Sequence, residues 1–240
     1  PYQANRTLGV LSKMFNLAKK WGMLESAATN PAQGIEKNPE RSRERFVSES
    51  EMPKLIAAIE AYPDQYIRSC IMLMAFTGIR AGSAMALRWD DVSFDDGEIL
   101  ERDSKTSVKG EIVRHKLSDA AIGLLRSVPP RSGSPFLFPG SGRTGHIVEL
   151  KSAWAVIKRN AGIRESEDNR LWLHDLRRTV GSWLARSNYN SVIIMRALNH
   201  KKLQTAQRYQ RIGEQDVVRD ALNDITRKML GKRPGLAVVK

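Results

Sequence analysis

The sequence predicts an α+β fold that is mainly helical, with a small antiparallel sheet of about three strands packed on helices. Apolar residues recur at helical spacing in most segments of the 240-residue chain. Residues 89–117 instead form short extended runs separated by turn signals, and helical segments resume at Ser118. A hydrophobic share of 41% is ordinary for a chain that buries a core, which argues against a wholly disordered protein.

The N-terminal segment is expected to be separate from the rest. Residues 7–23 predict an amphipathic helix, and residues 36–46 are almost all charged or polar, as in an interdomain linker. A new unit begins at Ser48, because Ser48 and Glu51 have the spacing of a capping box. We therefore expect four parts: the remnant of a first domain at 1–40, a linker at 41–47, a main domain at 48–212, and a C-terminal helix and tail at 213–240.

The elements of the main domain follow from apolar spacing and turn signals. Further helices are predicted at 64–76, 81–88, 118–128, 149–161, 175–186, 191–198 and 215–230. Strands are predicted at 89–94 and 98–102 around the turn Asp95-Asp96-Gly97, and at 105–108 and 111–117 around Lys109-Gly110.

Charge and cysteine content bound the function. The chain has 39 Lys and Arg against 26 Asp and Glu, a formal net charge of +13. Such a surplus favours a polyanionic partner, most often nucleic acid, although an unspecialised basic surface is the alternative. Cys70 is the only cysteine, so no internal disulfide is possible, and we expect a core thiol in a reducing cytoplasm.

Neither a membrane span nor a secretory signal is expected, because no apolar run is long enough and the N-terminus lacks the signal pattern. The chain starts at Pro1 without Met, so we expect a fragment of a longer protein. No Cys/His cluster has the spacing of zinc ligands, and neither a metal nor another cofactor is expected.

Four separated clusters combine polar residues of catalytic type. They centre on Arg80 in Thr77-Gly78-Ile79-Arg80, on Lys105, on the pair His174 and Arg177, and on the pair His200 and Tyr209. Each is ordinary when taken singly, since a surface arginine or a half-buried tyrosine needs no special function.

Taken together and in this order, the clusters resemble the tyrosine recombinase family, the phage-type integrases. That family combines an Arg in a Thr-Gly-x-Arg box, a hairpin Lys, a His-x-x-Arg box, and a late His followed nine residues on by Tyr. Here Tyr209 follows His200 by nine residues, and Leu87-Arg88-Trp89-Asp90-Asp91-Val92 also looks like the family. The resemblance covers residues 48 to about 212, and residues 7–40 resemble the end of the family's core-binding domain.

The resemblance implies a site-specific recombinase that cleaves and rejoins DNA through a 3′-phosphotyrosine, without ATP, for integration or excision of a mobile element. Arg80 and Arg177 would clamp the scissile phosphate, and Tyr209 would be the nucleophile. His174 would serve in acid–base catalysis, Lys105 would protonate the 5′-oxygen, and His200 would hydrogen-bond the phosphate. Candidate DNA contacts outside this set, which could equally be solvated cations, are Lys109, Arg114 and Arg178.

Two positions depart from the family pattern. The family usually has Glu or Asp three residues after the first Arg, whereas this chain has Ser83, so we expect another group to orient Arg80. The family's usual Leu-Gly-His is Leu198-Asn199-His200 in this chain. Asn is tolerated in left-handed backbone, so this departure is minor.

Three further polar residues are expected to be structural: Asp175 as a helix N-terminal acid, and His115 and His146 without a nameable partner.

Alternatives remain at this point. A type IB topoisomerase has a similar constellation but relaxes supercoils, and a non-catalytic DNA-binding or architectural protein could carry a degenerate site. The expected partners are double-stranded DNA, a homotetramer on synapsed DNA, and accessory DNA-bending or directionality proteins, with the protein associated with the nucleoid when bound. The helix at 215–230 either folds back on its own core or exchanges between subunits about a hinge at Ile212-Gly213.

Overall fold

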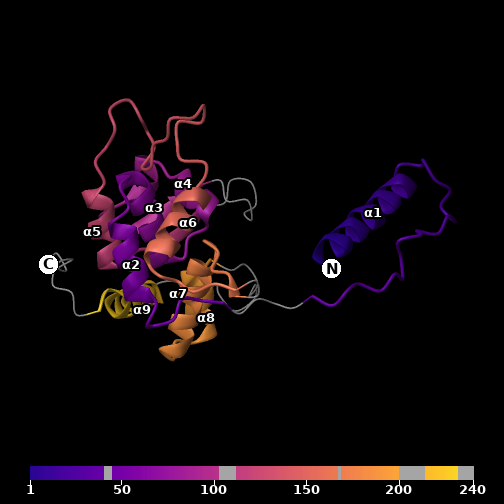
Figure 1. Cartoon of the computed structure of the whole chain (residues 1–240). Helices are drawn as coiled ribbons and strands as arrows, with labels where there is room; N and C mark the ends of the chain where they lie inside the picture. Colours follow the sequence, from indigo (N-terminus) through magenta and orange to yellow (C-terminus); the bar gives the residue numbers. More distant parts are fainter. Residues whose placement is uncertain (41–44, 103–111, 167–168, 200–213, 232–240) are drawn as a thin grey trace. The chain divides into compact units, whose positions relative to one another are not determined.

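The chain forms two compact units in the computed structural model, Pro1–Glu44 and Arg45–Lys240 (Figure 1). The structure describes residues 1–40, 45–102, 112–166, 169–199 and 214–231. The four-part division made from the sequence, with its core-binding remnant and linker, stays a prediction.

The first unit is one helix with a returning segment. Helix α1 (Tyr2–Lys20) begins five residues before the predicted start, because Asn5 N–H already donates to the Pro1 carbonyl over 3.1 Å. The segment after α1 is fastened by asparagines. The Asn5 amide donates to the Asn38 carbonyl (2.8 Å), and that of Asn30 donates to the Ser12 carbonyl (2.9 Å). Polar contacts therefore hold this unit together, while several large apolar side chains stay exposed, among them Val10, Met14, Trp21 and Met23.

The second unit is built around α3 (Gln65–Thr77), whose residues from Ser69 to Thr77 are all buried. Asp64 caps its N-terminus by accepting the N–H groups of Tyr66 and Ile67, and Gly78 ends it in the left-handed conformation. Cys70 on this helix is buried, as predicted for a core thiol.

The other described helices of this unit are α2 (Met52–Glu60), α4 (Ala81–Met85), α5 (Asp119–Ser127), α6 (Lys151–Asn160), α7 (Asp175–Arg186), α8 (Ser191–Ala197) and α9 (Glu214–Leu230). Ser118 caps α5, where its hydroxyl accepts the Ala121 N–H over 3.2 Å. Helix α3 contacts α2, α4, α5, α7 and α9, so the site residues that follow it are held by the centre of the core.

The described strands form a three-stranded antiparallel sheet in the order β1 (Val92–Ser93), β2 (Glu98–Glu101), β3 (Val113–Lys116). This confirms the predicted α+β class. The predicted strand at 89–94 is wrong in its first half, which is a 3₁₀ turn, η1 (Trp89–Asp91). Asp91 closes this turn, because its carboxylate accepts the Arg88 N–H over 3.0 Å. The strand predicted at 105–108 lies outside the described residues.

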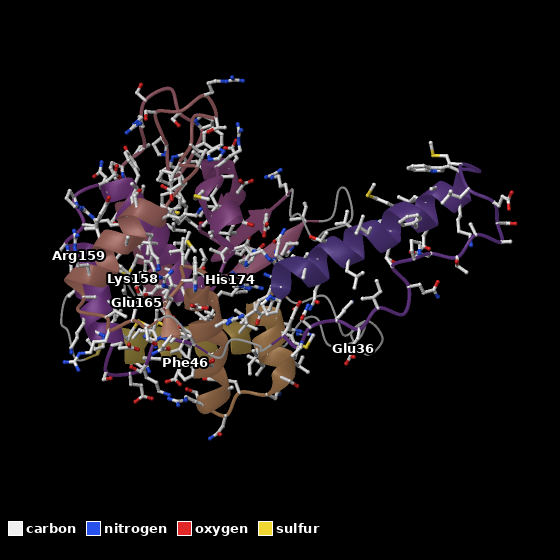
Figure 2. The ribbon with its side chains drawn as sticks, turned by 45° about the vertical axis from the view of Figure 1, so that its right-hand side comes forward. Glu36, Phe46, Lys158, Arg159, Glu165 and His174 are labelled. Atoms are coloured by element: carbon white, nitrogen blue, oxygen red, sulfur yellow. The ribbon has the colours of Figure 1, made fainter. Side chains whose placement is uncertain are left out.

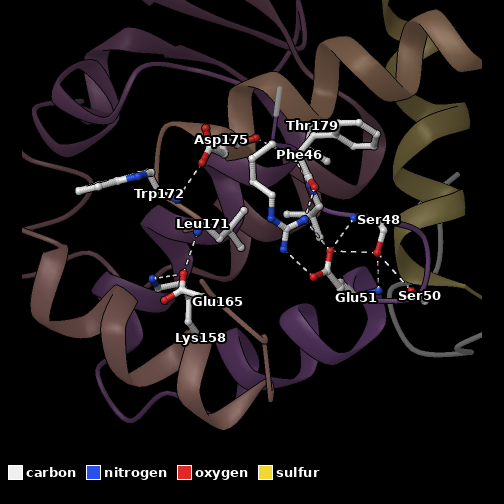
Figure 3. A network of polar contacts seen from close by, with 12 residues as sticks. Phe46, Ser48, Ser50, Glu51, Lys158, Glu165, Leu171, Trp172, Asp175 and Thr179 are labelled. Atoms are coloured by element: carbon white, nitrogen blue, oxygen red, sulfur yellow. Dashed lines mark hydrogen bonds and ion pairs between the residues drawn. The ribbon is translucent and has the colours of Figure 1, made fainter. Parts of the chain in front are cut away.

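The segment entering this unit is fastened to α2 and α7 (Figure 3). Ser48 and Glu51 form the predicted capping-box contacts, although α2 itself starts only at Met52, directly after Glu51. The Glu51 carboxylate also pairs with Arg45 over 2.5 Å. Beside this pair, the Val47 N–H donates to the Thr179 hydroxyl of α7 over 2.9 Å. The helix that carries Arg177 is thus held from the start of the unit.

Helix α9 packs against its own unit. Its side chains at Val218, Leu222, Ile225 and Met229 are buried, and the helix contacts α2, α3, α5, α7, α8 and β3. The structure therefore shows the fold-back arrangement of the two considered for this helix. Exchange between subunits in a DNA-bound assembly stays a prediction. No helix among the described ranges has both the length and the apolar character needed to cross a bilayer.

Candidate active site

The turn after α3 positions Arg80. The Thr77 hydroxyl donates to the Leu73 carbonyl (2.7 Å) and accepts the Ile79 N–H (3.2 Å), while Gly78 turns the backbone with φ 67°. A β-carbon on Gly78 would approach Leu198 Cδ2 to 2.8 Å, so the close packing of this turn also requires glycine. Arg80 follows in extended backbone as the N-cap residue of α4 and is half-buried.

Arg177 ties three segments together. It projects from α7, is only 5% exposed, and donates from Nη1 to the Gly78 carbonyl over 2.7 Å. Its Nη2 donates to the Leu198 carbonyl at the end of α8. Because the guanidinium is planar and rigid, these two bonds fix the orientation of the Arg177 side chain. Arg177 thereby sets the end of α3 against the residues that precede His200.

The charges of Arg80, His174 and Arg177 act on one another. Burial and the positive charge of Arg80 lower the pKa of Arg177 to about 10, while the negative charge of Glu101 raises it. Desolvation, followed by the charges of Arg177 and Arg178, lowers the pKa of His174 below its ordinary value. The site therefore concentrates positive charge, which suits an anionic ligand, and favours a neutral His174 that can accept a proton.

His174 stands at the solvent-exposed edge of this cluster. It is the N-cap residue of α7 and belongs to the exposed residues; Figure 2 labels its position. The structure thus brings together Arg80, His174 and Arg177 among the predicted catalytic residues. The other four predicted residues of the hairpin and the C-terminal region, Lys105, Lys109, His200 and Tyr209, lie outside the described residues.

The two described candidates for DNA contacts carry ion pairs within the protein. Arg114 on β3 pairs with the buried Glu98, and its own side chain is 56% exposed. Arg178 on α7 lies 3.6 Å from Asp175, with its side chain 38% exposed. Both remain open to solvent, and their contact with DNA stays a prediction.

Asp175 and His146 have structural partners. The Asp175 carboxylate is buried and accepts the Trp172 N–H at the start of α7 over 2.8 Å, as expected for a helix N-terminal acid (Figure 3). His146 bonds through Nδ1 to the Ile147 carbonyl (2.7 Å), and its ring lies against Phe136. In the part of the chain that the structure describes, no three His, Cys, Asp or Glu side chains gather as a metal site would need.

Glu101 was not among the predicted site residues, and no partner was predicted for His115. Glu101 is buried at the end of β2, accepts the Ser83 hydroxyl over 2.5 Å, and binds His115 Nε2 over 2.9 Å. The register pairs Ile99 with His115, which places Glu101 and His115 diagonally on one face of the sheet. The alternation of side chains along each strand could have suggested that Glu101 and His115 share a face. That inference requires the register between the two strands, which the sequence does not give.

A sequence model of the Phage integrase family matches residues 45–215, which is most of the chain. The chain therefore belongs to the phage integrase family, as the resemblance of its motifs predicted. The matched range includes every predicted catalytic residue, from Arg80 to Tyr209.

Two curated relatives are recombinases. Tyrosine recombinase XerA of Pyrococcus furiosus is 27% identical over 195 residues, which cover 75% of this chain and 64% of XerA. The shufflon-specific DNA recombinase of Escherichia coli is 25% identical over 213 residues, covering 84% of this chain and 49% of that protein. The chain thus spans about half to two thirds of the length of these relatives.

Solved structures share the fold. The integrase of mycobacterium phage Brujita aligns with a TM-score of 0.59 at 19% identity, covering 90% of this chain and 69% of that one. A lambda integrase tetramer bound to a Holliday junction gives 0.62 at 20% identity, covering 90% and 58%. The Tn1549 transposon integrase in complex with circular intermediate DNA gives 0.64 at 15% identity, covering 83% and 71%.

Proposed function

We propose that this chain is the catalytic part of a site-specific DNA recombinase, an integrase that cleaves and rejoins DNA through a 3′-phosphotyrosine for integration or excision of a mobile element. One observation carries the proposal. Arg80, His174 and Arg177 act on one another in a positively charged site, in a chain that belongs to the phage integrase family. The names of XerA and the shufflon recombinase support the same activity.

The two arginines serve as the phosphate clamp. Attack on a phosphodiester builds negative charge on the non-bridging oxygens, and fixed cations stabilise that charge without rearranging during the reaction. Arg177 is suited to this role because its guanidinium is already held by two backbone carbonyls. Arg80 belongs to the same cluster and follows the turn that is fixed by Thr77 and Gly78.

Proton transfers accompany the strand cleavage. The Tyr209 oxygen attacks the phosphorus, and the bond to the deoxyribose 5′-oxygen breaks, so a proton leaves the phenol and another reaches the 5′-oxygen. A phenol with an ordinary pKa near 10 needs a base, and His174 is neutral enough to accept its proton. Lys105 protonates the leaving oxygen, and His200 hydrogen-bonds the phosphate. Rejoining reverses these steps, because the phosphotyrosine bond conserves the energy of the broken phosphodiester.

The assembly follows from the same proposal. Its substrate is double-stranded DNA at recombination sites, and by analogy with the lambda integrase tetramer on a Holliday junction it works as a homotetramer. Residues 1–40 form part of a core-binding domain, joined by the linker at 41–47. Accessory DNA-bending or directionality proteins assist, and the bound protein is located at the nucleoid in the cytoplasm.

A nicked suicide duplex carrying the attachment site tests the function. Cleavage releases a short 5′-hydroxyl fragment that diffuses away, so the covalent protein–DNA species accumulates and survives denaturing electrophoresis. A non-catalytic binding protein would give only a salt-labile complex. A type IB topoisomerase would relax supercoiled plasmid that lacks the site, whereas the proposed recombinase requires the site and exchanges strands between two duplexes.

A further inference from the structure

A chain of polar contacts links both sides of the candidate site. It runs from the Ser83 hydroxyl to Glu101 Oε1 (2.5 Å), from Glu101 Oε2 to His115 Nε2 (2.9 Å), and from His115 Nδ1 to the Asn199 amide (2.9 Å). Glu101 and His115 are 8% and 3% exposed, so the middle of this chain is buried. We refer to Ser83, Glu101, His115 and Asn199 as the Glu101 network.

The ends of the network adjoin catalytic segments. Ser83 lies on α4, the helix whose N-cap residue is Arg80. Asn199 directly precedes His200 and has φ 48°, a left-handed conformation that Asn tolerates. The network therefore joins the arginine turn to the backbone that leads toward Tyr209, by way of the sheet.

The contacts define which ring nitrogen of His115 donates and which one accepts. The Asn199 amide nitrogen also donates to the Arg114 carbonyl over 3.1 Å, and a carbonyl can only accept. The same nitrogen must therefore donate its second hydrogen to His115 Nδ1. With Nδ1 accepting, the ring carries its proton on Nε2 and donates it to Glu101. Glu101 thus accepts from both Ser83 and His115, as an ionised carboxylate does.

The negative charge of Glu101 acts on Arg177 in the arginine clamp. Arg177 is only 5% exposed, and its burial and the positive charge of Arg80 both disfavour its charged form. The negative charge of Glu101 favours that charged form. Glu101 also accepts the hydroxyl of Ser83, the position at which the family usually has an acid.

We propose that Glu101 and His115 are positioning residues for strand cleavage, which orient Arg80 and the segment before His200 and balance the charge of the arginine clamp. This inference rests on the proposed function. It also accounts for the two departures from the family pattern as one arrangement, because Ser83 and Asn199 are the two ends of the network. Ser83 leaves room for the Glu101 carboxylate, and Asn199 holds the histidine that fixes that carboxylate.

The test compares Glu101→Gln with Glu98→Gln in single-turnover cleavage of the suicide duplex at saturating protein. Glu98 is a matched control, because it is also a buried carboxylate of β2 but pairs with Arg114 and Lys116. We expect Glu101→Gln to cleave about 10- to 100-fold more slowly, by analogy with the loss of outer partners that orient metal ligands. Glu98→Gln is expected to cleave within about threefold of the wild type.

A rescue variant separates positioning from simple stability. Ser83→Asp alone places a second carboxylate beside Glu101, and their repulsion should slow cleavage. Ser83→Asp combined with Glu101→Gln leaves one carboxylate between positions 83 and 101. This double variant should regain at least about tenfold of the lost cleavage rate. A double variant no faster than Glu101→Gln would overturn the charge-balancing role. Thermal unfolding of each variant establishes that folded protein is compared.

Asn199→Gly keeps the inference testable if Glu101→Gln does not fold. Glycine accepts the left-handed conformation, so the change removes only the amide donor, and we expect cleavage about three- to tenfold slower. Cleavage at the wild-type rate by Asn199→Gly, or by folded Glu101→Gln, would overturn the proposal. If the wild-type protein itself forms no covalent adduct, the proposed function fails instead.

Discussion

Glu51 and Glu101 are both bonded to a basic side chain and a serine, yet Glu51 holds a structural segment in place while Glu101 acts on the candidate site. Glu51 binds Arg45 and Ser48 and fastens the entry of the second unit beside α7. Glu101 binds His115 and Ser83 and acts on the charge of Arg177. The partners of a carboxylate, more than its burial, indicate whether losing it will affect stability or chemistry.

The largest effect is expected at the group that Glu101 supports. Arg177→Ala removes the clamp and leaves the Gly78 and Leu198 carbonyls without their donors. Single-turnover cleavage should fall at least about 100-fold, and the free energy of unfolding should fall by about 1–3 kcal/mol per orphaned carbonyl. Arg80→Ala is the comparison, with a similar loss of cleavage and little change in unfolding. Near-normal cleavage by either variant would contradict the clamp.

Glu51→Gln should show the opposite pattern to Glu101→Gln. The change weakens the bonds to Arg45 and Ser48, and we expect the free energy of unfolding to fall by about 1–3 kcal/mol. Cleavage by the folded protein should stay within about twofold of the wild type, since the described partners of Glu51, Arg45 and Ser48, lie outside the predicted catalytic set. Urea unfolding together with single-turnover cleavage measures both; a large loss of cleavage with unchanged stability would reverse the comparison.

The dependence of stability on pH tests whether Glu51 stabilises the fold through its charge. The hydrogen bond from Arg45 comes first among the causes that lower the pKa of Glu51 to about 2, against an ordinary value of 4.5. Because the folded pKa is the lower one, this stabilisation is complete above about pH 4.5 and is lost as the pH falls toward 2. The stability difference between wild type and Glu51→Gln should therefore shrink from pH 5 to pH 2, as urea unfolding across this range would show. A constant difference would mean that Glu51 does not act through its charge.

A smaller effect is expected from cations outside the clamp. If Arg178 contacts a phosphate, Arg178→Ala should reduce the slope of log affinity against log salt by about one, through counterion release. Lys228, an exposed cation on α9 that pairs with Asp224, offers a control whose substitution should leave the slope unchanged. Equal slopes for wild type and Arg178→Ala would remove Arg178 from the DNA-binding surface.

The sequence predicted the parts of this molecule that local rules determine. The helix limits near Asp64, Thr77 and Ser118 depend on neighbouring residues, and motif order alone predicted Arg80, His174 and Arg177 as site residues. The proposed acid Glu101 could not be found in this way, because it meets Ser83 and His115 only through the register of β2 and β3.

Two other features needed the tertiary structure. The apolar stripe of α9 indicated that something covers it, while the identity of the cover, its own unit, came only from the packing. The first half of the strand predicted at 89–94 is a 3₁₀ turn instead, in which the Arg88 N–H donates to the Asp91 carboxylate and the Trp89 N–H donates to the distant Pro135 carbonyl.

The most direct test of the central claim is covalent capture by Tyr209. Wild-type protein and Tyr209→Phe are incubated with the same nicked attachment-site duplex, and denaturing electrophoresis with peptide mapping locates any protein–DNA bond. The wild type should carry the DNA 3′-phosphate on Tyr209, and Tyr209→Phe should bind the duplex but form no adduct. An adduct of equal yield with Tyr209→Phe, or one mapped to another residue, would contradict the assignment of Tyr209 as the nucleophile.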